Sequence, residues 1–174
     1  NFLFKFLWFL PNLESQKYWS ECQADDNHGY KKYLNINNNS RILTKEIKNR
    51  TNKKDKILDL CCNIGRHLNN LSEQGYSNLY GVDINSLAIE KMKIIYKNLD
   101  STKISCENAE SYLLNTKSNY FDLVYTYGAT VELIPPTFPI IKEICRVAKN
   151  FVIFLIQENG HAYPRFWRYE FKKN

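Results

Sequence analysis

The sequence predicts an α/β fold, with a mainly parallel, doubly wound sheet, helices on both faces and an N-terminal helical cap. From residue 56 onward, short apolar runs alternate with amphipathic segments of helical length. The first two apolar runs each end in an acid, Asp59 and Asp83. A tight turn closing at Gly65 follows the first run. Such alternation favours right-handed crossovers and parallel strands.

The 174 residues suit one compact domain. We expect residues 1–55 to form the helical cap and a linker, and residues 56–174 to form the core. The first ten residues, NFLFKFLWFL, are too short to span a bilayer and predict an amphipathic cap. Residues 14–50 read as helical, with a polar break at Asn35–Ser40.

After that break, we expect Ser40 to cap a helix. The apolar positions of this helix are Ile42, Leu43 and Ile47.

The core is predicted to begin with a strand at Ile57–Leu60. A helix follows at Arg66–Gln74 and is stopped by Gly75. The second strand is expected at Leu79–Ile84. Asn85 or Ser86 then caps a helix whose buried face is Leu87, Ala88, Met92, Ile95 and Leu99.

A third strand is expected at Lys103–Cys106, followed by a helical turn through Ala109–Leu114. The fourth strand is Tyr120–Tyr127, and a helix is expected at Phe138–Val147. The fifth strand, Phe151–Gln157, is apolar throughout, which predicts burial on both faces.

Charge and cysteine content exclude several classes of protein. The net charge of +6 permits an anionic partner, but the basic residues are scattered, as on solvated faces. An odd number of cysteines, without a CxxC pair, argues against a disulfide framework and against a zinc site; they are Cys22, Cys61, Cys62, Cys106 and Cys145. Reduced thiols and the lack of a membrane span predict a cytoplasmic protein without a metal.

The turn after the first strand is the part of the sequence that indicates a ligand-binding function. An acid, Asp59, is followed at every second position by Cys61, Asn63 and Gly65. A second acid, Asp83, stands about 20 residues beyond the turn, where a carboxylate can accept hydrogen bonds from both ribose hydroxyls. This order resembles the cofactor-binding half of the Rossmann-like class I S-adenosylmethionine-dependent methyltransferases, of the type 11 kind, over roughly residues 56–157.

The resemblance implies S-adenosylmethionine as the cofactor. Asp59 and Asp83 would orient it, Asn108 would read the adenine amino group, and the backbone of Ala109 would meet a ring nitrogen. The family has glycine where Cys61 stands, so this side chain would have to point away from the ligand. The complete set of cofactor-binding residues that we expect is Asp59, Cys61, Asn63, Gly65, Asp83, Ile84, Asn108, Ala109 and Tyr125.

Methyl transfer from a sulfonium depends mainly on positioning the acceptor in line. A base matters only for a hydroxyl or a protonated amine. The candidates are Glu132, which matches a family acid, and His161 after the fifth strand. Leu133 stands where the family often has His.

The acceptor is expected to be a small molecule, with a glycan or glycan precursor as one class. The tail GHAYPRFWRYEF predicts either a lid that binds an anionic or sugar-like acceptor through Arg165 and Arg168, or packing against the end of the sheet. The sequence lacks the Pro-Pro-aromatic signature of DNA amino-methylating enzymes directly after the fourth strand. DNA is therefore excluded as a partner, RNA is disfavoured, and the oligomeric state stays open.

Three other interpretations remain. An RNA methyltransferase would use the scattered lysines, and a nicotinamide-dependent oxidoreductase would need more glycines than CCNIGR contains. A non-catalytic methyltransferase-like binding module would explain Cys61 and Leu133. A full core of this family has two further strands, so we expect the sequence to be truncated at both ends, with the C-terminal strands missing.

Overall fold

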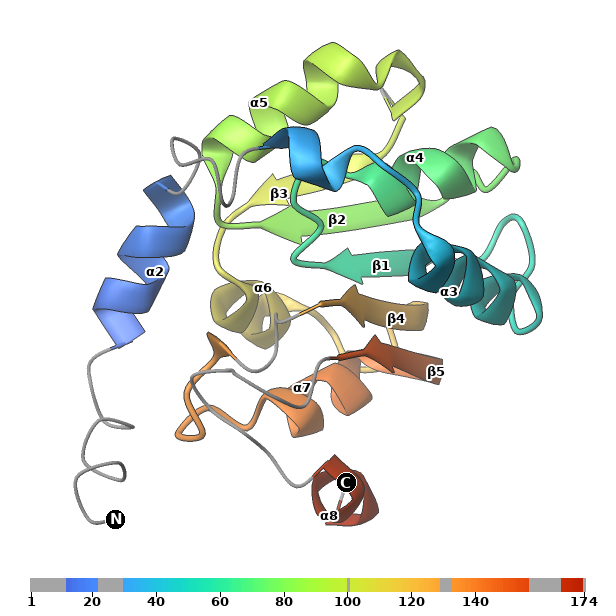
Figure 1. Cartoon of the computed structure of the whole chain (residues 1–174). Helices are drawn as coiled ribbons and strands as arrows, with labels where there is room; N and C mark the ends of the chain where they lie inside the picture. The colour runs from blue at the N-terminus through green and yellow to red at the C-terminus, as the bar shows by residue number, and fades with distance from the viewer. Residues whose placement is uncertain (1–11, 22–29, 100, 129–132, 157–166, 174) are drawn as a thin grey trace.

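The computed structural model describes residues 12–21, 30–99, 101–128, 133–156 and 167–173. Its centre is a five-stranded parallel sheet with the strand order β3-β2-β1-β4-β5 (Figure 1). The strands are β1 (Ile57–Leu60), β2 (Leu79–Asp83), β3 (Lys103–Cys106), β4 (Phe121–Tyr127) and β5 (Ala148–Leu155). This arrangement confirms the predicted Rossmann-like, doubly wound α/β fold.

Helices cover both faces of the sheet. They are α2 (Asn12–Glu21), α3 (Asn38–Lys48), α4 (Arg66–Glu73), α5 (Ser86–Ile95), α6 (Ala109–Asn115), α7 (Ile140–Val147) and α8 (Trp167–Lys173). Two 3₁₀ turns, η1 (Tyr30–Tyr33) and η2 (Lys97–Leu99), complete the described elements.

Two buried clusters divide the core along the alternation of the strands. Leu58 and Leu60 of β1 face the layer of α6, α7 and α8. Ile57 faces the layer of α3, α4 and α5. Successive side chains of a strand point to opposite faces, so Asp59 lies on the same face as Ile57.

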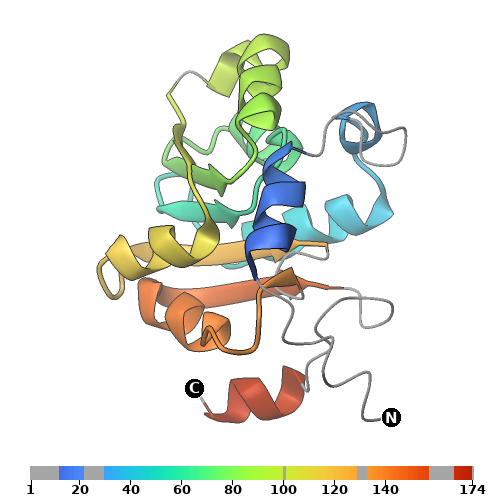
Figure 2. The same ribbon diagram turned by 90° about the vertical axis from the view of Figure 1, so that its left-hand side faces the viewer.

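Helix α2 lies at the carboxyl ends of the strands, where the arrowheads point in Figure 1. Figure 2 looks onto that end of the sheet and shows α2 crossing in front of it. The side-chain amide of Asn85 donates to the backbone carbonyl of Trp19 (3.0 Å), which ties α2 to the end of β2.

Two expected helix details are wrong. The N-cap of α3 is Asn37, whose Oδ1 accepts from the Ser40 amide (2.9 Å). Ser40 lies inside the helix and is buried, whereas Ile42 is 47% exposed. The chain enters the helix earlier because an Asn side chain caps as well as Ser.

The buried face of α5 also differs from the prediction. Its buried residues are Ala88, Ile89 and Met92, while Leu87 is 44% exposed and Ile95 is 37% exposed. Leu99 is buried, but from η2, because α5 ends at Ile95. The N-cap of α5 is Asn85, which is one of the two residues predicted for it, Asn85 and Ser86.

Strand β5 is not buried on both faces, and Phe151 is 39% exposed. Within the described residues β5 is an edge strand, paired with β4 alone. The described part of the aromatic tail packs on this strand, since buried Trp167 of α8 meets the ring of Phe154 at 6.3 Å between centroids. The predicted lid residue Arg165 lies outside the described residues, and Arg168 is exposed.

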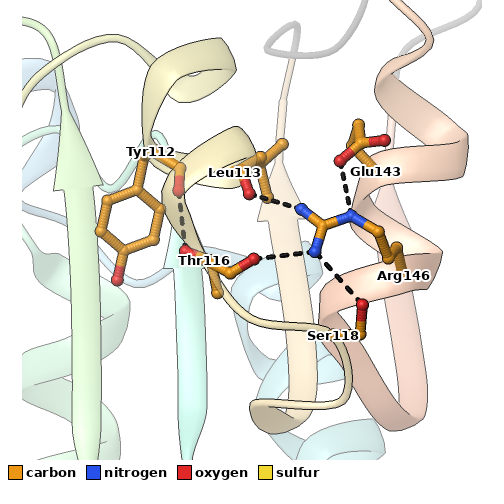
Figure 3. A network of polar contacts seen from close by, with 6 residues as sticks. All are labelled: Tyr112, Leu113, Thr116, Ser118, Glu143 and Arg146. Atoms are coloured by element: carbon orange, nitrogen blue, oxygen red, sulfur yellow. Dashed lines mark hydrogen bonds and ion pairs between the residues drawn. The ribbon is translucent and has the colours of Figure 1, made fainter.

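Arg146 joins α6 to α7 (Figure 3). Its guanidinium donates to the carbonyls of Leu113 (2.6 Å) and Thr116 (2.7 Å) at the end of α6. Its Nε also donates to Glu143 (2.7 Å), which is on the preceding turn of α7. Arg146 therefore adds a charged donor to the carbonyls at the carboxyl end of α6, where the Leu113 carbonyl also accepts from the Thr116 amide (3.0 Å).

No helix in the described ranges is both long and apolar enough to cross a membrane. The same residues contain no group of His, Cys, Asp or Glu side chains arranged to hold a metal ion.

Candidate functional site

A cavity of about 270 Å³ opens at the carboxyl ends of the strands. It brings together residues from β1, β2 and the loop after β3, as expected at this edge of a doubly wound sheet. The predicted cofactor residues that line it are Asp59, Cys61, Asn63, Asp83, Ile84, Asn108 and Ala109. Gly65 and Tyr125 do not line it.

The loop after β1 turns through three left-handed residues at alternate positions. The φ angles are +62° at Cys61, +50° at Asn63 and +72° at Gly65. Side chains are disfavoured in this conformation, and Asn tolerates it better than most residues. The loop therefore has the backbone conformation of a glycine-rich turn, although Cys61 and Asn63 stand at two of its three left-handed positions.

Gly65 is required for a reason other than ligand approach. A Cβ atom there would lie 2.7 Å from Sδ of Met92 on α5. Gly65 thus lets the start of α4 pack against α5, in addition to supplying the positive φ.

Asp83 is buried at the end of β2 and holds the loop in place. Its Oδ2 accepts from the Asn63 amide (2.7 Å), and its Oδ1 accepts from the Asn85 amide (2.9 Å). Burial raises the pKa of Asp83, and these backbone donors partly offset that shift. Each carboxylate oxygen keeps a further lone pair that could accept from a ribose hydroxyl.

Asp59 is 2% exposed, and its Oδ2 has no hydrogen-bond partner among the described residues. Burial raises the pKa of Asp59 to about 7, while the neighbouring Tyr125 hydroxyl acts in the opposite direction. Tyr125 is fully buried behind Asp59, away from the cavity. An unsatisfied buried carboxylate oxygen is costly unless a ligand supplies a donor.

Asn108 is the N-cap of α6, and its Oδ1 accepts from the Ser111 amide (2.7 Å). The same oxygen keeps a second lone pair for an adenine amino group. Ala109 is buried in the first turn of α6 and lines the cavity.

The sequence reasoning missed Arg66 and His67, which share the cavity with Asp59. They begin α4 and line the cavity together with Tyr127 from the end of β4, a residue whose position after the fourth strand the sequence did indicate. Nε of Arg66 donates to Nε2 of His67 (3.1 Å), and the guanidinium lies 4.9 Å from the centre of the Tyr127 ring. The position of Arg66 and His67 directly after the Gly65 turn was the signal that could have identified them.

Aromatic residues from the N-terminal region were also missed as part of the site. Trp19 of α2 and Tyr33 of η1 line the cavity, together with Gln16. Sequence spacing gives no indication of this contact, because Trp19 and Tyr33 lie far along the chain from the strand ends that they meet.

Both predicted catalytic residues, Glu132 and His161, lie outside the described residues. Leu133, which stands where the family often has His, lines the cavity.

The strand order, the cavity and the two acids define a Rossmann-like ligand-binding domain. The cavity lies where the strand order reverses, between β1 and β4, and β1 and β2 each have an acid at their end. A family model described as a methyltransferase domain matches residues 51–172, so the chain belongs to this family. Membership of this family implies S-adenosylmethionine as the methyl donor.

Solved structures share the fold. The PH0226 protein of Pyrococcus horikoshii is 23% identical with a TM-score of 0.59, over 81% of this chain and 63% of that one. A SAM-dependent methyltransferase of Archaeoglobus fulgidus is 21% identical with a TM-score of 0.51, over 63% of this chain and 47% of that one.

A putative sarcosine dimethylglycine methyltransferase of Galdieria sulphuraria is 15% identical with a TM-score of 0.54, over 64% of this chain and 43% of that one. This chain therefore spans less than two thirds of the length of each of these proteins. No curated protein sequence matches it.

Proposed function

We propose that this domain binds S-adenosylmethionine in the cavity and transfers its methyl group to a small-molecule acceptor. The observation that carries the proposal is the unpartnered buried Oδ2 of Asp59, in a cavity that Asp83 and Asn108 also line. An orphaned acceptor at this place fits a ligand that brings its own donor, as the ammonium of the cofactor does.

Each of the predicted cofactor residues would have its own role in binding. Asp83 would hold the ribose hydroxyls, Asn108 and the backbone of Ala109 would contact the adenine, and Ile84 would provide an apolar wall. Cys61 and Asn63 shape the loop beside the ligand, Gly65 permits the turn, and Tyr125 supports Asp59 from behind. When bound, the cofactor supplies a sulfonium-activated methyl group.

The size and walls of the site support a small acceptor. Trp19, Tyr33 and Tyr127 narrow the cavity with aromatic rings, which suits a small acceptor better than a folded macromolecule. A glycan or its precursor is one candidate. A small amine is another, because one structure that shares the fold is named as a putative sarcosine dimethylglycine methyltransferase.

Positioning would dominate catalysis, and Glu132 and His161 stay our candidates for a base. We further propose a cytoplasmic protein in which residues 1–55 form a cap over a core of residues 56–174. The four cysteines that the structure describes are free thiols, which supports this location.

One observation favours a second candidate, a non-catalytic binding module. Leu133 contributes an apolar side chain to the cavity where the family often has a base. Such a module would bind the cofactor or a partner without transferring a methyl group.

The test is calorimetric titration with S-adenosylhomocysteine, with NAD as the control ligand. We expect micromolar binding of S-adenosylhomocysteine alone. Asp83→Ala should weaken that binding far more than His161→Ala, because we propose Asp83 as the ligand of the ribose hydroxyls and His161 as a base that acts on the acceptor. Binding of NAD alone, or of neither ligand by the folded protein, would contradict the proposal.

Binding without methyl transfer to any amine, sugar or carboxylate acceptor tested would favour the non-catalytic module. If transfer occurs, Glu132→Gln and His161→Ala should be compared at saturating cofactor. A loss of methyl transfer in only one of the two variants would identify the base.

A further inference from the structure

A second hollow, of about 430 Å³, lies between α3 and α4. We call it the α3–α4 groove. Three of the side chains that line it are basic, Arg41, Lys45 and Lys48. Within the described residues, the groove has no acid in its wall and shares no lining residue with the cavity at the strand ends. It is therefore a separate concave surface with an excess of positive charge.

The three basic residues lie on one face of α3, because they are spaced by four and by three positions. All three are exposed. In the part of the chain that the structure describes, no carboxylate forms an ion pair with any of them, and Glu46 pairs with Arg50 instead. Like charges at this spacing repel one another and weaken a helix. An anion bound in the groove would remove that repulsion.

Amide side chains add neutral donors to the groove. Nδ2 of Asn70 on α4 donates to the hydroxyl of Thr44 on α3 (2.7 Å), and Oδ1 of Asn70 accepts from the side chain of Gln74 (3.2 Å). These two bonds fix the orientation of the Asn70 amide, which keeps one hydrogen for a ligand. Asn49, the C-cap of α3, also lines the groove.

The position of Lys45 and Lys48 has a second explanation, which does not extend to Arg41. Both lysines are in the last turn of α3, where a cation interacts favourably with the helix dipole. Arg41 is the fourth residue of the same helix, near the end where the dipole disfavours a cation. Stabilisation of the helix end therefore accounts for two of the three charges and leaves the third for a ligand.

We propose that the α3–α4 groove binds a small molecule that carries two phosphate groups. A phosphate group carries about 1.5 to 2 negative charges at pH 7, so two of them match three cations better than carboxylates do. The planar fork of Arg41 and the compact charges of the lysines are both suited to phosphate. This inference does not depend on the proposed function.

A nucleic acid fits the groove less well than a small molecule. Single-stranded nucleic acid is held largely by bases that stack on aromatic side chains. No aromatic residue of the described chain lines the α3–α4 groove. The hollow therefore offers contacts to phosphate groups and none to the face of a base.

The test is calorimetric titration of inorganic pyrophosphate into the wild type and four variants, at constant ionic strength. The variants are Lys45→Gln, Lys48→Gln, Arg41→Lys and the matched control Lys93→Gln. Lys93 is an exposed lysine in the last turn of α5 and lines neither hollow. Circular dichroism shows whether each variant is folded, and a single-stranded RNA and S-adenosylhomocysteine are titrated in parallel.

Pyrophosphate should bind the wild type. Lys45→Gln and Lys48→Gln should each weaken it by about 10-fold or more, the usual cost of losing a hydrogen bond between charged groups. Arg41→Lys should cost less, because it keeps the charge and loses only the fork. Lys93→Gln should stay within about twofold of the wild type, and none of the variants should alter the affinity for S-adenosylhomocysteine.

Absence of pyrophosphate binding by the folded wild type would overturn the inference. A loss in Lys93→Gln equal to that in Lys45→Gln would overturn it as well, because binding would then follow net charge and not the groove. RNA binding that Lys45→Gln weakens, without pyrophosphate binding, would assign the groove to nucleic acid instead. The proposed function stands or falls separately, on the titration of the wild type with S-adenosylhomocysteine.

Discussion

The variant Asp59→Asn tests whether the buried carboxyl group of Asp59 lowers the stability of the fold while it contributes to ligand binding. The native carboxyl group is buried, and its pKa is raised from 3.8 to about 7, so the folded state holds a proton that the unfolded state has already released. Between these two values the unfolded state binds fewer protons, and the stability of the wild type therefore falls as the pH rises. Asparagine resembles the protonated acid and cannot titrate.

The size of the effect follows from the shift. Each unit of pKa difference is worth about 1.4 kcal/mol, so the full shift of about three units corresponds to at most about 4 kcal/mol. Between about pH 5 and about pH 8, the wild type should lose about 3 kcal/mol through Asp59, and the variant should lose none of this. Groups that do not interact with Asp59 are common to both proteins and cancel in the comparison, whereas the charge of Asp83 acts on Asp59 and is part of the measured difference.

The assay is urea unfolding of both proteins at the two pH values, without ligand. Asp59→Asn should become the more stable protein at the higher pH, although its affinity for S-adenosylhomocysteine falls. Parallel pH dependence in the two proteins would refute the reasoning, because it would mean that Asp59 has an ordinary pKa in the fold.

Three further changes test the loop and the helix contacts. Arg146→Gln should destabilise the fold by about 2–3 kcal/mol in urea unfolding, because it leaves helix carbonyls at the end of α6 without a charged donor; a loss below about 0.5 kcal/mol would show that water replaces the guanidinium. Asn63→Ala should cost about 1 kcal/mol and Asn63→Gly much less, since only glycine is free of strain at positive φ; thermal unfolding with equal losses in both variants would contradict that explanation. Gly65→Ala should cost more than Asn63→Ala, because its methyl group also meets Met92; a smaller loss in the same assay would mean that Met92 moves aside freely.

The existence of the five strands along the chain and the position of the acids could be predicted because both depend on local pattern. Apolar runs and their ends mark the strands, and parallel strands place their carboxyl ends at one edge. Asp59 and Asp83 therefore came together as expected. The burial of a strand was less predictable, as β5 shows. An apolar strand at the edge of a sheet can have the same run of apolar residues as a strand in its middle.

Contacts between distant segments could not be predicted from one sequence. Trp19 reaches the cavity from α2, and Tyr127 meets Arg66 only because α4 and β4 converge beside β1. The face of α5 was misjudged for a geometric reason, since Leu87 and Ile89 are two positions apart and point to different sides of a helix.

The loop after β1 has a consequence for how related sequences can diverge. Its shape is set by the sign of three backbone angles, and Cys61 and Asn63 adopt the required sign at a cost of only a few kcal/mol. A pattern that demands glycine at every second position would therefore reject this chain. The feature that such sequences must preserve is the handedness of the turn, together with the acid that anchors it through the Asn63 amide.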